Sequence, residues 1–198
     1  MSDPAAPRIV LLASTSAYRR ELLARLRVPF EAVAPGCDEH RLPDEPAQAL
    51  ALRLAQLKAD TVAARHPGSV VIGSDQVAVR GTEILGKPGT AERCMAQLQQ
   101  SSGHEVVFLT AVHVVDGRNA RAESHVDQTV VRFRSLGADE IARYIATDAP
   151  LDCAGGFKAE SLGIALFDRI ESSDPTALTG LPLIWVSAAL RRAGIPVP

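Results

Sequence analysis

Acidic side chains follow two apolar stretches in a pattern that suits metal or proton chemistry. Asp75 comes after the run VVIG at residues 70–73, and Asp38 and Glu39 come after PFEAVAP at residues 29–35. Apolar runs bounded by glycine or proline predict buried strands. A carboxylate beside such a strand is costly to desolvate unless it binds a cation or a proton. Carboxylates gathered at strand ends commonly hold magnesium next to substrate phosphates, and a cap or turn acid is the alternative for each.

Basic side chains occupy positions where they could neutralise an anionic ligand. Arg19 and Arg20 open a predicted helix directly after the cap sequence STS at residues 14–16. Backbone N–H groups at a helix start favour anions, and the arginine fork matches phosphate oxygens. Lys58 flanks the apolar stripe of a helix expected over residues 46–65, from whose edge it could project toward a cleft. Singly, each is typical of a solvated charge, but together they favour a polyphosphate clamp.

One phosphate-binding motif is nearly matched. Residues 81–88, GTEILGKP, satisfy G-x-x-x-x-G-K, but Pro88 replaces the serine or threonine whose hydroxyl binds magnesium. A P-loop is therefore excluded, and what remains is a rigid turn that could aim Lys87 at a fixed point. The motifs G-x-S-x-G, H-E-x-x-H and G-x-G-x-x-G do not occur. We interpret His113 as a strand residue and Cys153 as structural.

Hydrophobic periodicity predicts an α/β fold with a mixed, twisted sheet and flanking helices around a cleft. Strands are expected at residues 8–13, 29–35, 70–79, 104–115, 121–134 and 163–167, with the turn DGRNA joining the two long ones as a hairpin. Helices are expected at residues 17–26, 46–65 and 138–147, after the cap Thr90 and after Pro182, with Leu50, Leu54, Leu57 and Thr61 on the inner face of the second. We expect one domain over residues 1–198, with two lobes and loose tails at 1–7 and 195–198.

Composition narrows the class of protein. The chain has 198 residues, of which 46% are hydrophobic, so it can bury a core. Its net charge of −2 disfavours a nucleic-acid groove, which needs a basic excess. No stretch reads as a membrane span or a signal peptide. Three widely spaced cysteines suit a reducing cytoplasm.

An ordered series of short motifs runs along nearly the whole chain, from about residue 9 to residue 194. They are LASTSAYRRELL, CDE, RLAQLKA, IGSDQV, GKP, TVVRFR, CAGGFKAESLG and GLPL. The series resembles the Maf (septum formation inhibitor) family of nucleoside triphosphate pyrophosphatases.

The resemblance implies hydrolysis between the α- and β-phosphates of a nucleotide, assisted by a divalent metal such as Mg²⁺ or Mn²⁺. It implies a sheet split by a deep cleft, like that of the inosine triphosphatase-type enzymes, and a possible homodimer. Asp75 matches the family's catalytic acid, and Ser14 and Arg19 match its phosphate-binding helix start. Glu39 matches a metal ligand, and Lys58 and Lys87 match groups that neutralise the phosphates.

Two branches of the family differ in the base they prefer, and this chain resembles the 7-methyl-GTP branch. It carries Tyr18 before Arg19-Arg20, Gln76 after Asp75, and CAGGFKAE at residues 153–160. An aromatic face and a carboxylate both favour the cationic base that N7-methylation creates. Tyr18 is expected to stack on it, Glu160 to accept from the N1–H and exocyclic amine of guanine, and Gln76 to complete base or sugar selection. The known members of this branch carry tryptophan where this chain has Tyr18.

Two other functions remain open at this point. One is a pyrophosphatase of the branch that prefers dTTP and UTP, against which Gln76 and Glu160 argue. The other is a nucleotide-binding regulator of septum formation without turnover, a role that would have no need of a general base.

Overall fold

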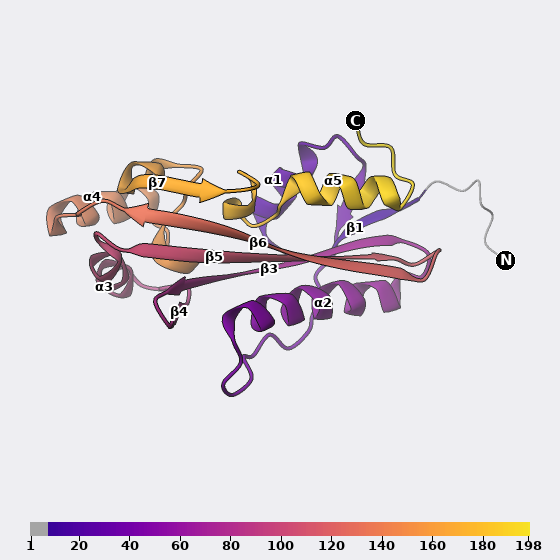
Figure 1. Ribbon diagram of the computed structural model, residues 1–198, viewed down its shortest axis with the longest axis horizontal. Coiled ribbons are helices and arrows are strands. Elements are labelled where there is room, and N and C mark those ends of the chain that lie inside the picture. The colour runs from indigo at the N-terminus through magenta and orange to yellow at the C-terminus, as the bar shows by residue number, and fades with distance from the viewer. Residues whose placement is uncertain (1–7) are drawn as a thin grey trace.

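The structure, a computed structural model, describes residues 8–198; the tail expected at residues 1–7 lies outside this part (Figure 1). Its strands are β1 (Val10–Leu12), β2 (Phe30–Ala32), β3 (Val70–Arg80), β4 (Glu83–Leu85), β5 (Glu105–Asp116), β6 (Arg121–Phe133) and β7 (Phe167–Ser172). Its α-helices are α1 (Ala17–Ala24), α2 (Ala47–Arg65), α3 (Ala91–Ser101), α4 (Ala138–Asp148) and α5 (Leu183–Arg192). No helix of residues 8–198 is both long enough and apolar enough to cross a membrane.

The strands form one mixed sheet, which confirms the predicted fold class. Their order is β2-β1-β3-β5-β6-β7, and β4 pairs separately with β3. β1 lies parallel to both β2 and β3, whereas the pairs of β3 with β5, β5 with β6 and β6 with β7 are antiparallel. The predicted hairpin is confirmed, since β5 and β6 pair along their whole length.

One edge of β3 changes partners, and this creates the cleft. β1 pairs with Val70–Ile72, and β4 pairs with Ala78–Arg80. Between them, residues 73–77 pair with β5 on one side only, and no described strand covers the other side. Asp75 therefore lies in the middle of an 11-residue strand, beside the gap where the sheet divides.

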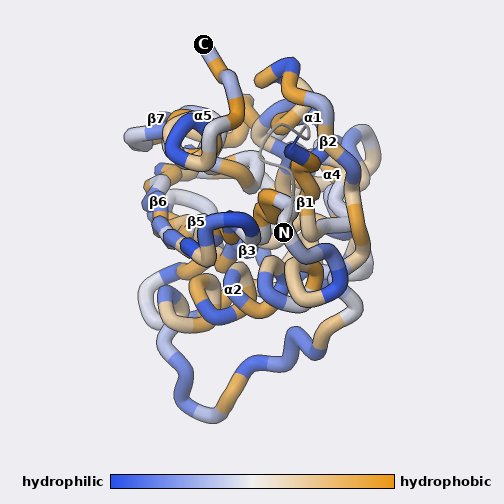
Figure 2. Tube along the Cα trace, turned by 90° about the vertical axis from the view of Figure 1, so that its right-hand side faces the viewer, coloured by the Kyte–Doolittle hydropathy of each residue, from blue (hydrophilic) through white to orange (hydrophobic). Residues whose placement is uncertain are grey.

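Helices cover both faces of the sheet at the end that holds β1. Alternate residues of β3 point to opposite faces, so Val70 and Ile72 pack with α1 and α5, while Val71 packs with α2. The end-on view shows α2 on one side of the sheet and α1 with α5 on the other (Figure 2). This layered core fixes both the start of α1 and the inner face of α2 relative to β3.

At the opposite end of the sheet, the core contains a cluster of packed phenylalanine rings. Phe157 meets Phe108, Phe133 and Phe167 edge to face, with centroids 4.7–5.6 Å apart, and α3 and α4 lie at this end (Figure 1). Gly155 has φ 82°, and a Cβ there would lie 3.1 Å from the ring of Phe108. Glycine is therefore required where the chain turns past the rings.

The sequence predicted Asp75 at a strand end, but Asp75 lies in the middle of β3. Three further details of the sequence prediction are wrong. Residues 163–167 are mostly a 3₁₀ turn, Leu162–Leu166, and the strand β7 only begins at Phe167. Gly163 lies too close to the backbone of Lys158 to tolerate a Cβ, so a tight turn forms where the apolar run had predicted a strand. The tail expected at residues 195–198 is held against the core, because Ile195 is buried and Val197 packs beside it.

The third error concerns the inner face of α2. Leu50 and Leu54 are buried and Leu57 packs against their cluster, but Thr61 is only half-buried. The buried face instead runs through three alanines and includes a lysine, in the order Ala51, Ala55, Lys58, Ala59 and Val62. Small side chains let the helix lie directly on β3, where a Cβ on Gly73 would fall 2.3 Å from the carbonyl oxygen of Ala55.

We therefore predict that Gly73→Ala lowers the free energy of unfolding by at least about 1–3 kcal/mol, since the added methyl has no space and both backbones must shift. Urea unfolding measures the change. Gly86→Ala is the matched control, because a Cβ there meets nothing within 4 Å and its φ is not positive. Equal stability of the two variants would contradict the close contact.

Candidate active site

A buried lysine joins two carboxylates at the gap in the sheet. The Nζ of Lys58 lies 2.6 Å from Oδ1 of Asp75 and 2.7 Å from Oε2 of Glu39. The side chains of Lys58 and Asp75 are 6% and 13% exposed, whereas that of Glu39 is 48% exposed. The ammonium thus compensates a largely buried carboxylate from β3 and holds a second one at the mouth of the cleft.

The start of α1 supplies an arginine to the same uncovered edge of β3, from the face of the sheet opposite α2. Ser16 caps the helix by accepting a hydrogen bond from the N–H of Arg19, and Ser14 accepts one from the N–H of Ser16. The Nε of Arg19 donates to the carbonyl of Gly180 at 2.9 Å, so the guanidinium is oriented by the backbone. Burial lowers the pKa of Arg19, and the nearby carboxylates of Asp75 and Glu39 oppose this shift.

The segment 177–180 is tied down through its carbonyl groups. Ser74 donates to the carbonyl of Gly180 at 2.9 Å, and Thr110 donates to that of Ala177 at 3.0 Å. The Nε2 of Gln76 donates to the carbonyls of Ala177 and Leu178, both at 3.0 Å. Side chains of β3 and β5 therefore position a loop that borders the cleft and that orients Arg19.

These contacts also fix the side-chain amide of Gln76. Its nitrogen faces two carbonyl oxygens and the hydroxyl of Thr110, so the opposite orientation would place oxygen against oxygen. Gln76 therefore offers the cleft its Oε1, which accepts hydrogen bonds and cannot donate them.

Aromatic and sulfur-containing side chains line the far part of the cleft. The thiol of Cys153 points at the hydroxyl of Tyr18, 3.8 Å away. Burial raises the pKa of the Cys153 thiol to about 11, so it is protonated at neutral pH and unsuited to act as a nucleophile. Burial also raises the pKa of Tyr18 above its ordinary value. Glu160 borders this region and, among residues 8–198, has no hydrogen-bond or ion-pair partner.

The structure brings all nine predicted site residues together. Eight of them line a cavity of about 220 Å³ in the cleft: Tyr18, Arg19, Glu39, Lys58, Asp75, Gln76, Lys87 and Glu160. The ninth, Ser14, lines an adjoining cavity of about 700 Å³ that shares Arg19, Glu39, Lys58 and Lys87. The two hollows are continuous, and cationic groups gather where they meet.

The sequence also suggested two residues that do not line the cleft, and it gave no indication of three residues that do. Arg20 and Asp38 line neither cavity; Arg20 is exposed, and Asp38 accepts from the backbone N–H of His40. Asp152 lines both cavities without having been considered, since it stands in a turn with no local signal. Leu178 and Thr179 also line the cleft, and only the nearby Gly180-Leu181-Pro182 marked their segment as a turn.

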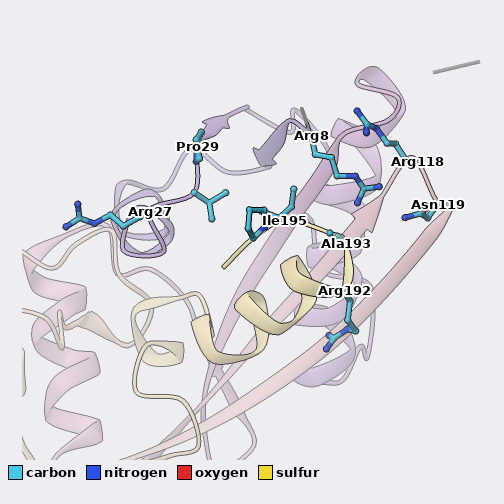
Figure 3. Close-up of a pocket in the computed structure, with 11 residues that line it drawn as sticks. Arg8, Arg27, Pro29, Arg118, Asn119, Arg192, Ala193 and Ile195 are labelled. Carbon is cyan, nitrogen blue, oxygen red and sulfur yellow. The ribbon is translucent and has the colours of Figure 1, made fainter. Parts of the chain in front are cut away.

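A separate hollow of about 800 Å³ contains four arginines but does not form an anion site (Figure 3). Arg8 is bound by Asp116, and Arg192 is bound by Glu123. The guanidinium groups of Arg8, Arg27 and Arg192 point in different directions (Figure 3). The charges therefore do not converge on one ligand.

The cleft fits a metal ion only if the substrate supplies further ligands. No group of three or more His, Cys, Asp or Glu side chains within residues 8–198 could form a complete metal site. Glu39 and Asp75 converge on Lys58 and offer hard oxygen donors. Divalent cations such as magnesium are commonly bound by one or two carboxylates plus substrate phosphates and water, so this pair could supply two of the ligands that such a cation needs.

Comparison with known proteins identifies the family. The model of the Maf-like protein family matches residues 9–193. The chain belongs to the Maf-like family. This confirms the resemblance predicted from the ordered motifs.

Three curated relatives of this Maf-like chain share one name. A protein of Xanthomonas campestris pv. campestris (strain 8004), called 7-methyl-GTP pyrophosphatase, is 55% identical over 192 residues, which cover 97% of this chain and 99% of the relative. Proteins of the same name from Alkalilimnicola ehrlichii and Albidiferax ferrireducens are 52% and 51% identical, covering 95% and 100% of this chain and 94% and 98% of theirs. Among solved structures, the Ham1 protein of Staphylococcus aureus matches with a TM-score of 0.48 and 13% identity, covering 79% of this chain and 90% of that one.

The lysine bridge yields a stability prediction. Lys58→Met is expected to lower the free energy of unfolding by about 3–5 kcal/mol, because it leaves the carboxylate of Asp75 buried without its cation. The double variant Lys58→Met/Asp75→Asn should recover part of this loss, since it removes that charge as well. Urea unfolding measures both. Lys87→Met changes an exposed lysine of the same cleft and is the control. Its free energy of unfolding should stay within about 0.5 kcal/mol of the parent value. Strictly additive effects of the two substitutions in the double variant would refute the coupling between Lys58 and Asp75.

Proposed function

We propose that this Maf-like protein is a nucleoside triphosphate pyrophosphatase that hydrolyses 7-methyl-GTP to 7-methyl-GMP and pyrophosphate. The observation that carries the chemistry is the continuous cleft, in which Asp75, Lys58 and Glu39 form one ion-paired group with Arg19 and Lys87 beside it. The names of the curated relatives support the choice of substrate.

The charge distribution orients the nucleotide. Arg19 keeps its terminal guanidinium nitrogens for the ligand because only its Nε is bound to Gly180. Lys87 is exposed in the cleft and, within the described chain, has no ion-pair partner. The triphosphate therefore lies among these cations and the base lies toward Tyr18, Cys153 and Glu160.

Asp75 is the proposed general base. A water molecule attacks the α-phosphorus and forms a new P–O bond, and its proton passes to the carboxylate of Asp75. The bridging P–O bond breaks and its electron pair leaves with pyrophosphate. Lys58, Lys87 and Arg19 stabilise the negative charge that develops on the phosphate oxygens. A divalent cation held by Glu39 and Asp75 would neutralise further phosphate charge.

The part of the cleft that is proposed to hold the base suits a methylated guanine. N7-methylation makes the purine cationic, and an aromatic ring with a nearby carboxylate favours such a base. Tyr18 provides the ring and Glu160 the carboxylate, whose oxygens accept from the N1–H and exocyclic amine of guanine. The fixed Oε1 of Gln76 accepts from a ribose hydroxyl or a base N–H.

We also propose that the enzyme works in the cytoplasm and forms a homodimer. The three cysteines Cys37, Cys94 and Cys153 are free in the structure, which suits a reducing compartment. The homodimer is carried over from the family resemblance.

The deciding experiment is a substrate panel. Pyrophosphate release is measured from 7-methyl-GTP, GTP, dTTP, UTP and CTP, with Mg²⁺, with Mn²⁺ and with EDTA. Metal-dependent release from 7-methyl-GTP is expected, and Asp75→Asn should lower it by about 10²–10⁴-fold through loss of the general base. Asp168→Asn is the control, since it makes the same substitution at an exposed residue of β7 that lines neither cavity of the cleft. Preference for dTTP or UTP would overturn the base assignment, and no release at all would favour the non-catalytic regulator.

A second prediction tests base selection. Glu160→Gln is expected to lower kcat/KM for 7-methyl-GTP by about 10–100-fold, because the substituted amide opposes its NH₂ group to the donors of guanine. The residue is exposed, so the fold should not change. Glu31→Gln alters another exposed acid, on β2, and should have no effect. Steady-state kinetics measure both, and an equal rate for Glu160→Gln and the parent would exclude Glu160 from base recognition.

A further inference from the structure

The cleft extends beyond the region that is proposed to hold the base. Beyond Glu160 lies a recess of about 420 Å³, lined by Ala159, Glu160, Ile164, Ile170, Ser172, Pro175, Leu178 and Thr179. Four of these residues also line the central cavity: Ala159, Glu160, Leu178 and Thr179. The recess and the central cavity therefore share one wall.

Shared walls give the order of the hollows along the cleft. The central cavity and the hollow at the phosphate end share seven lining residues: Ser16, Tyr18, Arg19, Glu39, Lys58, Lys87 and Asp152. The recess shares no residue with that hollow. The sequence of spaces is thus phosphate end, central cavity and recess, so a nucleotide with its phosphates on Arg19 directs its base at the recess.

The chemistry of the recess differs from that of the rest of the cleft. Five of its eight residues are apolar: Ala159, Ile164, Ile170, Pro175 and Leu178. The hydroxyl of Ser172 is already bound to the carbonyl of Asp174 at 2.7 Å. Glu160 stands at the boundary and is the only charged group among the lining residues. The recess therefore suits an uncharged, apolar group attached to the base.

We propose that the recess is a subsite for an apolar substituent on the exocyclic amine of guanine, so that the substrate class extends to N2-alkylated 7-methylguanine nucleotides. This rests on the proposed function, in which Glu160 accepts from N1–H and one amine hydrogen. The second amine hydrogen is not used by the carboxylate and is the position that can carry a substituent, and Glu160 itself also lines the recess. A volume of about 420 Å³ reaches the range of about 300–1,000 Å³ typical of small-molecule pockets, far more than a methyl group needs.

The test compares 7-methyl-GTP with N2-benzyl-7-methyl-GTP. Affinity is measured by titration calorimetry in EDTA, which is expected to prevent turnover, and pyrophosphate release is measured separately with Mg²⁺. The benzyl nucleotide is expected to bind about tenfold more tightly, since each methylene-sized group removed from water strengthens binding by about fourfold and the recess is partly open. Equal or weaker binding of the benzyl nucleotide overturns the proposal.

A variant pair assigns the effect to the recess. Ile164→Asp introduces a charge into it at a side chain that is 53% exposed, and Ile9→Asp makes the same change at a 56% exposed isoleucine beside β1. Ile164→Asp should weaken the benzyl nucleotide at least tenfold more than 7-methyl-GTP, whereas Ile9→Asp should leave their ratio unchanged. The same ratio in both variants contradicts the subsite.

The two proposals fail in different ways. Hydrolysis of 7-methyl-GTP together with equal or weaker binding of the benzyl nucleotide would refute the subsite and leave the proposed function standing. Lack of hydrolysis of both nucleotides would refute the proposed function, and the binding ratio would still decide the subsite.

Discussion

The buried ammonium of Lys58 between Asp75 and Glu39 is the interaction on which the cleft depends. A carboxylate in the middle of a central strand is tolerated only with a cation in contact. That cation must come from α2, and it reaches Asp75 because alanines and Gly73 allow the helix to lie close to the strand. The packing of the helix on the strand and the ion pair between Lys58 and Asp75 therefore both require a short distance between α2 and β3.

The second requirement is a place where substrate can approach the strand. β1 is only three residues long, and β4 pairs with β3 further along. The helix start that follows β1 therefore faces the uncovered part of β3, with Arg19 turned toward Gly180. A short strand, a capped helix and a tethered loop together bring residues distant in sequence to one cleft.

Local signals predicted much of this arrangement. The caps Ser16 and Thr90, the hairpin of β5 and β6 and the strand that carries Asp75 all follow from neighbouring residues. The wall formed by residues 177–180 could not be found in this way, because its position is set by hydrogen bonds from Ser74, Gln76 and Thr110. The apolar run at residues 163–167 was wrongly predicted to be a strand for a similar reason. Its conformation depends on a contact outside the run, the close approach of Gly163 to Lys158. Tyr18, Glu160 and Gln76 were assigned to the base through the family resemblance, since none of them has a spacing that reveals a role.

The three long strands have a mechanical consequence. β3, β5 and β6 run from the end covered by α1, α2 and α5 to the end covered by α3 and α4 (Figure 1), and their ladders continue past the cleft. Any hinge between the two ends would have to bend a hydrogen-bonded ribbon three strands wide. The spacing between the proposed phosphate-binding and base-binding walls is thus set when the protein folds. The protein then selects nucleotides by length, because the two ends of the sheet cannot close around a ligand that is too short.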